Sequence, residues 1–170
     1  ASLTTRFDAD VTCLKALNNG RIAVGLKSGQ LFLKNPNGEW TEAAKTTGEV
    51  HDVLLSDGAL FAAFGECGLA RFDTNGNLLW QKEIQRVATV YPWWELHTPV
   101  PLTLRLVRYH GREVLAAGCG DDSLKFFDFD GTLLESFYYY IGVPDQIELF
   151  DINEDGVNAV SYTHLRAHET

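Results

Sequence analysis

The stretch Phe72-Asp73-Thr74-Asn75-Gly76-Asn77-Leu78-Leu79-Trp80 places a polar turn that ends in glycine between two apolar segments. Asp and Asn favour turns and Gly supplies a positive φ, so the stretch predicts two antiparallel strands joined by a tight turn. The same four-residue pattern, here called the Gly box, recurs as Asn35-Pro36-Asn37-Gly38 and Asp128-Phe129-Asp130-Gly131. Three copies indicate an internal repeat.

A second kind of turn alternates with the Gly boxes and follows an apolar run each time. Its four copies are Asn19-Gly20, Asp57-Gly58, His110-Gly111 and Asp155-Gly156. Between the turns lie apolar, β-branched or aromatic segments of strand length. In the first repeat, the first three strands are expected at 11–17, 21–25 and 30–34. In the second repeat they are expected at 50–55, 59–65 and 69–72, and in the third at 102–107, 112–118 and 124–127. The fourth strands are expected at 39–41, 77–82 and 132–138.

Four strands repeating about every 40 residues, without a helical stripe, are typical of β-propeller blades. A β-sandwich is the alternative, but sandwiches do not repeat one turn motif at matched positions. We therefore predict an all-β fold, a partial β-propeller of about three four-stranded antiparallel blades plus the start of a fourth. This incomplete propeller would occupy residues 1–158, with blades near 10–46, 48–86, 100–140 and 145–158.

Two family resemblances are consistent with this fold. The stretch 72–80, with the related Phe127-Asp128-Phe129-Asp130-Gly131-Thr132-Leu133-Leu134, resembles the outer strand of quinoprotein-like (PQQ-like, WD40-like) propeller repeats. The stretch Ile147-Glu148-Leu149-Phe150-Asp151-Ile152-Asn153-Glu154-Asp155-Gly156 resembles the FG-GAP (VCBS) repeat, which implies a calcium loop. Such degenerate motifs specify an architecture better than an activity.

The candidate metal ligands are Asp151, Asn153 and Asp155, three oxygen donors at alternate positions before a glycine turn. Such a loop can wrap a hard cation, so Ca²⁺ is the predicted cofactor. A ninth-position carboxylate would complete the loop, and residue 159 stands there. The alternative is a hairpin whose acidic residues only cap the turn.

The candidate ligand-binding surface is the end of the blades that carries an insertion loop at 87–101. Proline density predicts an irregular loop there, and its aromatic residues could stack on a sugar or a peptide. Antiparallel topology puts the loop on one face with the turns between second and third strands. The candidate residues are Tyr91, Trp93, Trp94, His97, Glu66, Asp121 and Asp122. Alternatively, the adjacent tryptophans anchor the loop to its own blade.

Composition excludes several functions. The 170 residues carry 14 basic and 23 acidic side chains and a formal charge of -9, which argues against nucleic acid as a partner. No apolar stretch is long enough to span a bilayer. Cys13, Cys67 and Cys119 are odd in number and lack metal-site spacing, so we expect buried small residues, although a disulfide stays open.

The final segment, 159–170, is expected to be non-native. Residues 160–170 resemble the translation of a transposase sequencing adapter, and Ala159 would be a hybrid codon. His164 and His168 are accordingly given no weight as metal ligands. Together with the absence of methionine, this predicts a metagenomic fragment of a longer protein.

The expected function is a non-catalytic binding or scaffold module of a larger propeller protein that is periplasmic, cell-surface or secreted. Its partners would be a carbohydrate or protein ligand and the remaining blades. The alternative is a fragment of a propeller enzyme, either a polysaccharide lyase or a quinoprotein-type dehydrogenase. No catalytic residue is assigned, because no nucleophile motif accompanies the histidines.

Overall fold

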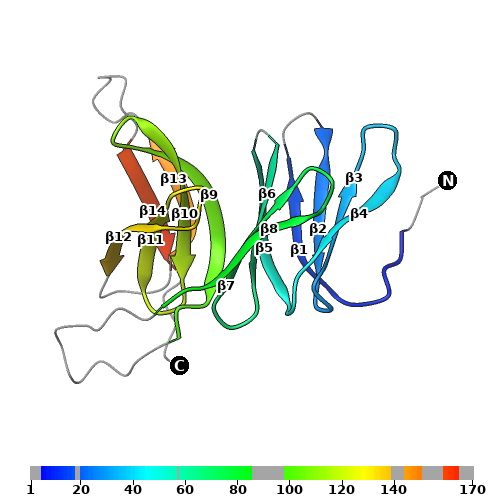
Figure 1. Cartoon of the computed structure of the whole chain (residues 1–170), viewed down its shortest axis with the longest axis horizontal. Coiled ribbons are helices and arrows are strands. Elements are labelled where there is room, and N and C mark those ends of the chain that lie inside the picture. Colours follow the sequence, from blue (N-terminus) through cyan, green and yellow to red (C-terminus); the bar gives the residue numbers. More distant parts are fainter. Residues whose placement is uncertain are drawn as a thin grey trace.

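The computed structural model describes residues 5–17, 20–56, 58–85, 98–138, 144–150 and 159–164, the last two ranges as backbone only. In these residues, the strands form three four-stranded antiparallel sheets and one two-stranded sheet. Strand order in each sheet follows chain order, so every sheet is an up-and-down meander. Figure 1 shows the first three sheets following one another along the longest axis of the molecule.

The first sheet contains β1 (Val11–Ala16), β2 (Ile22–Leu26), β3 (Gln30–Lys34) and β4 (Trp40–Lys45). The second contains β5 (Val50–Ser56), β6 (Ala59–Phe64), β7 (Gly68–Asp73) and β8 (Leu78–Glu83). The third contains β9 (Pro101–Tyr109), β10 (Arg112–Cys119), β11 (Ser123–Phe127) and β12 (Leu133–Tyr138). The fourth pairs β13 (Pro144–Phe150) with β14 (Ala159–His164).

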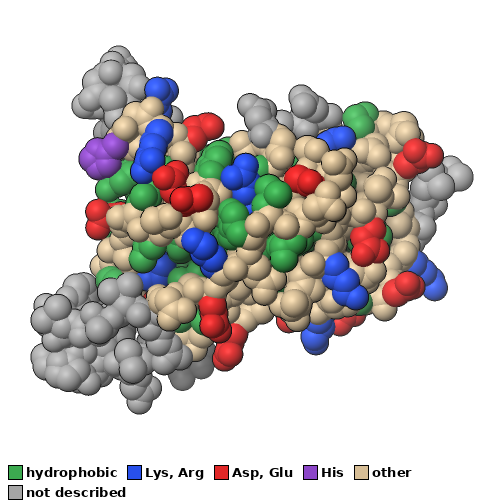
Figure 2. All heavy atoms as spheres, viewed as in Figure 1, with side chains coloured by type: hydrophobic (Ala, Val, Ile, Leu, Met, Phe, Trp, Pro, Cys, Tyr) green, Lys and Arg blue, Asp and Glu red, His purple; other side chains and the backbone are tan. Residues whose placement is uncertain are grey.

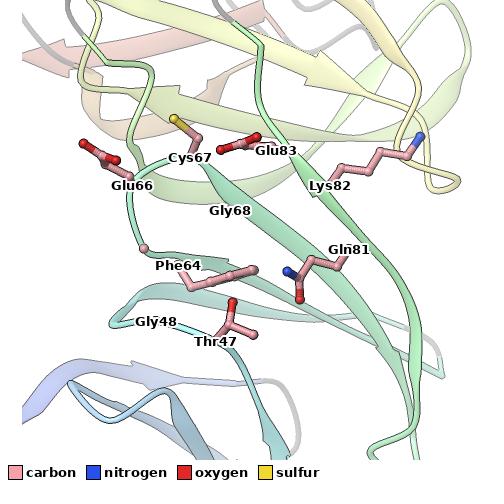
Figure 3. Close-up of a pocket in the computed structure, with 10 residues that line it drawn as sticks. Thr47, Gly48, Phe64, Glu66, Cys67, Gly68, Gln81, Lys82 and Glu83 are labelled. Carbon is pink, nitrogen blue, oxygen red and sulfur yellow. The ribbon is translucent and has the colours of Figure 1, made fainter.

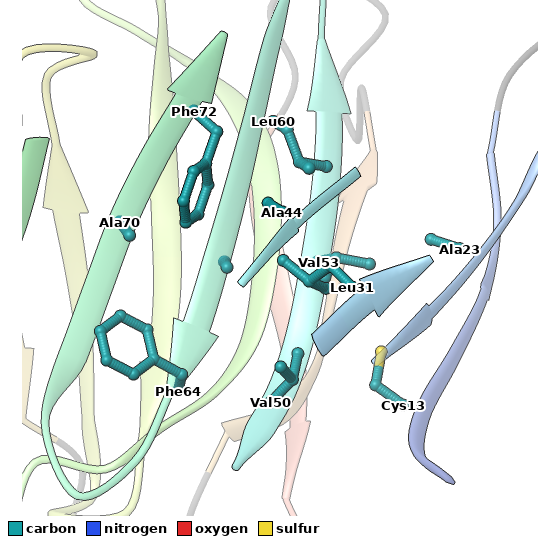
Figure 4. Packing of buried hydrophobic residues seen from close by; sticks show 11 residues of the cluster. Cys13, Ala23, Leu31, Ala44, Val50, Val53, Leu60, Phe64, Ala70 and Phe72 are labelled. Atoms are coloured by element: carbon teal, nitrogen blue, oxygen red, sulfur yellow. The ribbon is translucent and has the colours of Figure 1, made fainter. Parts of the chain in front are cut away.

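The sheets pack face to face, and β6 shows how one strand serves two neighbours. All six of its residues are buried. Side chains alternate along a strand, so Leu60 and Phe64 contact the core shared with the first sheet, whereas Phe61 contacts the core shared with the third. Each large apolar side chain buried in this way stabilises the fold by about 1.5–3 kcal/mol. Figure 4 shows the first of these two cores.

The first strand of each sheet lies at a sheet edge, and β1, β5 and β9 contact one another in sequence. Small residues permit the close approach. A Cβ on Gly25 would lie 2.5 Å from Cγ1 of Val50, so the two sheets leave no room for a side chain there. First strands gathered together, with successive sheets face to face, make these sheets the blades of a partial β-propeller.

The Gly boxes link neighbouring blades. In each box the amide of Gly38, Gly76 or Gly131 donates to the carbonyl of the first box residue, and each glycine has a positive φ. A Cβ on Gly76 would collide with the carbonyl of Ala43 in the preceding blade. Gly131 lies in the same way against Lys82. All three turns therefore close hairpins, and those of the second and third blades also contact the preceding blade.

Both the repeat and its four strands are confirmed, with differences in extent. The strand expected at 102–107 is longer, because β9 begins at Pro101, inside the loop expected at 87–101, and ends at Tyr109. The strand expected at 39–41 is longer, because β4 continues past an irregularity in its pairing with β3 and ends at Lys45. In the range assigned to the adapter-like tail, the backbone of 159–164 pairs with β13, with Ala159 opposite Phe150. The origin of that tail stays a prediction. In the described part of the chain no helix has the length and apolarity to cross a membrane.

Candidate functional site

The turn between β6 and β7 forms the centre of the candidate site and is fixed by three hydrogen bonds. The amide of Gly65 donates to the carbonyl of Glu49 at 2.7 Å, and the amide of Ile84 donates to the carbonyl of Cys67 at 2.8 Å. The imidazole Nε2 of His51 lies 2.7 Å from the Gly65 carbonyl, and it must donate because a carbonyl only accepts. Glu66 therefore stands on an anchored turn.

Two pockets flank this turn and share Glu66, Cys67 and Glu83 as a common wall. The first has a volume of about 370 Å³, and its other lining residues are Thr47, Gly48, Phe64, Gly65, Gly68, Gln81 and Lys82. The second has a volume of about 360 Å³ and reaches Ile84, Gln85 and Thr98. We call the two pockets together the blade-two groove. It crosses the end of the second blade from the β4–β5 connection to Thr98, and Figure 3 shows its first pocket.

Glycine shapes the first pocket. A Cβ on Gly48 would lie 3.1 Å from the Cα of Gly65, and a Cβ on Gly68 would lie 2.5 Å from the ring of Phe64. The buried Phe64 ring, 4% exposed, therefore has backbone rather than side chains packed against it here. Polar and charged side chains outnumber apolar ones in the lining, so the pocket suits a polar or charged group of a ligand.

Charge around the groove is uneven. Figure 3 shows the carboxyl groups of Glu66 and Glu83 on either side of Cys67, whereas the Lys82 ammonium extends away from them. That ammonium lies toward the third blade. Hydrogen bonds from Thr132 lower the pKa of Asp130 there, and the positive charge of Lys82 lowers it further. Within the described residues neither Glu66 nor Glu83 takes part in a salt bridge. The shared wall is thus acidic.

Asp121 and Asp122 lie on the corresponding turn of the third blade, between β10 and β11. Asp121 is 8% exposed, accepts a hydrogen bond from Ser123 and lies 3.7 Å from the fully buried ammonium of Lys125. Lys125 also donates to Ser136 at 2.9 Å and to the Tyr138 hydroxyl at 3.1 Å. The Asp121 carboxylate therefore neutralises the buried Lys125 ammonium. The position of Asp121 in the sequence does not reveal this role. Asp122 adopts a positive φ of 60°.

The other sequence-predicted residues lie outside the described part of the chain. These are the metal candidates Asp151, Asn153 and Asp155 and the ligand candidates Tyr91, Trp93, Trp94 and His97. In the part that is described, no group of three or more His, Cys, Asp or Glu side chains could hold a metal ion.

All three cysteines are described, and none forms a disulfide. Burial raises the pKa of Cys13 to about 11 and that of Cys119 to about 12, so both remain thiols at neutral pH. Cys67 is half-buried, lines both pockets and packs against the core between the second and third blades.

An ion pair joins the first strands of the three complete blades, and the sequence reasoning missed it. Lys15 on β1 donates to both carboxylate oxygens of Asp52 on β5, at 3.1 and 3.0 Å, and to the carbonyl of Leu104 on β9 at 3.1 Å. The Leu104 amide donates back to Asp52 at 2.7 Å. Burial lowers the pKa of Lys15, and the Asp52 charge opposes that shift. The sequence does mark each residue as unusual, because Lys15 and Asp52 are charged residues within largely apolar strands.

Comparison with known proteins shows the fold alone. No family model matches the chain, and no curated protein matches it. BBS1N in complex with ARL6DN, soaked with mercury, is similar at 16% identity and a TM-score of 0.63, over 95% of this chain and 51% of that one. The WD40 β-propeller domain of Doa1 is similar at 11% identity and a TM-score of 0.62, over 84% of this chain and 45% of that one. The Pan2 WD40 domain of Neurospora crassa is similar at 9% identity and a TM-score of 0.59, over 82% of this chain and 41% of that one. The chain covers only 38% to 51% of the length of similar solved structures such as these. Two of these are described as WD40 domains, one of them as a WD40 β-propeller, and the likeness supports a propeller fold for this chain.

Proposed function

We propose that the chain is a non-catalytic binding module of a larger propeller protein and that it holds a protein partner on its loop face. The loop face is the end of the blades that carries the β6–β7 and β10–β11 turns and the β4–β5 connection. The single observation that supports this proposal is the blade-two groove, whose two pockets open beside an anchored turn. Preformed recesses on rigid strands bind with a low cost in ordering.

A protein is favoured over a carbohydrate for two reasons. The groove crosses the whole end of one blade, which suits an extended segment of chain better than a single sugar ring. In addition, one solved structure of similar fold is that of BBS1N in complex with ARL6DN. That complex belongs to that protein, and it supports only the general capacity of such a fold for protein contact.

The test is a selection from a random-peptide display library, run in parallel with a glycan array, on the purified chain. The variant Thr47→Trp/Gln81→Trp fills the groove with neutral side chains, and Thr74→Trp/Asn75→Trp adds the same groups at the exposed Gly box on the opposite end. We expect peptides whose binding is lost in the first variant and kept in the second. Glycans as the only ligands, or peptides that lose binding in the second variant, would contradict the proposal.

We further propose that the parent protein is exported and binds a structural Ca²⁺ through Asp151, Asn153 and Asp155. Alternate oxygen donors before Gly156 support this proposal. Calorimetric titration of Ca²⁺ into the chain and into an Asp151→Ala/Asp155→Ala variant tests it, since equal heats would discard the site. The PQQ-like assignment of the repeats is proposed on the stretch 72–80, in which Trp80 contacts the next blade.

A further inference from the structure

The two pockets of the blade-two groove meet at one place. Glu66 and Glu83 line both of them, although Glu66 belongs to the β6–β7 turn and Glu83 to the end of β8. Figure 3 shows their carboxyl groups on either side of Cys67. A ligand segment that runs through both pockets must therefore pass these two carboxylates at the centre of its path.

The charges at this point are not balanced by the described protein. Both glutamates are exposed, and neither forms a salt bridge with a described residue. Lys82 lines the first pocket, but its ammonium lies against Gly131 of the next blade, 3.1 Å from the position of a Cβ there. Two carboxylates on one wall repel each other, and a cation placed between them would relieve that repulsion.

The shape of the groove also limits the ligand. Volumes of about 370 and 360 Å³ lie near the lower end of the range for small-molecule pockets, so each pocket suits a side chain rather than a folded domain. Phe64 lines the first pocket but is only 4% exposed, so most of the pocket surface is polar or backbone. Lys and Arg combine a flexible stem that can follow such a pocket with a cationic end.

We propose that the blade-two groove receives a lysine or arginine side chain from an extended segment of the partner, with Glu66 and Glu83 as its counter-ions. This proposal rests on the proposed function and specifies the chemistry of the partner at the same site. Arginine should bind more strongly than lysine, because a guanidinium can donate to two carboxylates at once.

The test uses capped tripeptides and amide NMR spectra of the chain. The probes are Ac-Gly-Arg-Gly-NH₂, Ac-Gly-Lys-Gly-NH₂ and the neutral Ac-Gly-Gln-Gly-NH₂. We expect the arginine probe to shift the amides of Gly48, Gly65 and Gly68, and the neutral probe to bind about tenfold more weakly. The double variant Glu66→Gln/Glu83→Gln should weaken arginine binding by about tenfold or more. Raising NaCl from about 50 to about 500 mM should weaken it as well.

A control for carboxylate removal away from the groove is Glu113→Gln, which removes one negative charge at the start of β10, where the double variant removes two. The affinity of this control variant for the arginine probe should stay unchanged. Equal binding of the neutral and arginine probes, or unchanged arginine binding in the double variant, would overturn the proposal. Shifts produced at these glycines by cellotetraose but not by the arginine probe would overturn it too. Library peptides that bind the groove without a basic residue would refute this inference alone, whereas the absence of any peptide ligand would refute the proposed function.

Discussion

The indole Nε1 of Trp80 donates a 2.9 Å hydrogen bond to the carbonyl of Phe129 and so joins the outer strand of the second blade to the Gly box of the third. Arg71 donates to the same carbonyl at 3.1 Å and lies over the rings of Phe61 and Phe129. The Phe61 and Phe129 rings are 5.2 Å apart. One carbonyl thus collects two donors across a blade interface.

The variant Trp80→Phe tests this contact. Phenylalanine keeps an aromatic ring but loses the donor, while Arg71 still satisfies the carbonyl. We expect the free energy of unfolding to fall by about 0.5–1.5 kcal/mol, as measured by urea denaturation. An unchanged urea midpoint would show that the interblade hydrogen bond contributes nothing.

The contact between Gly boxes and preceding blades can be isolated with two glycines. Gly38 and Gly76 have φ values of +90° and +83°, so alanine strains the backbone similarly at both. Only at Gly76 would the new Cβ meet the preceding blade, whereas nothing lies within 4 Å at Gly38. Gly76→Ala should therefore destabilise the chain by about 1–3 kcal/mol more than Gly38→Ala. Equal losses in thermal or urea unfolding would argue against close packing of the box on the preceding blade.

The ion pair at the first strands should matter far more than a surface pair. The Lys15 and Asp52 side chains are 16% and 12% exposed, and Asp52 also accepts from the Leu104 amide. Asp52→Asn leaves Lys15 buried without a counter-charge and should cost about 3 kcal/mol or more. Arg112→Gln is the control, because Arg112 is 54% exposed in its pair with Asp128 and should cost less than about 1 kcal/mol. Similar losses for the two variants would contradict a role for Asp52 in joining three blades.

The three thiols should differ in reactivity. Burial raises the pKa of Cys13 and Cys119 to about 11 and about 12, so at pH 8 both are protonated as well as covered. Cys67 is the most accessible of the three and lines the groove. We expect N-ethylmaleimide to modify Cys67 first, and a bound groove ligand to slow that reaction, as read by peptide mass mapping. Equal or faster modification of Cys119 would mean that the second and third blades are not packed as described.

The sequence predicts the fold well because its turns carry local chemistry. A Gly box fixes a hairpin by itself, and the unbroken apolar run at 59–64 already indicates a strand buried on both faces. Pairing between distant side chains has no such local code. Lys15 and Asp52 are 37 residues apart, and nothing near either one indicates the other. Asp121 likewise follows a strand like a loop residue, and only the buried Lys125 explains it.

The candidate site was predicted in part. Glu66 follows from blade topology alone, because the turn between second and third strands must lie on the loop face. Its companions Thr47, Gln81 and Glu83 come from a connection and an outer strand whose proximity depends on how far neighbouring blades are rotated. That rotation is set by interblade packing, such as Gly25 against Val50.

Hydrogen–deuterium exchange with and without a library-selected peptide tests the central claim, binding of a partner in the blade-two groove, most directly. We expect added protection in 64–68 and 81–84, whose residues line the pockets, and none in the Gly box at 73–76. Protection confined to that Gly box, with exchange at 64–68 unchanged, would contradict it.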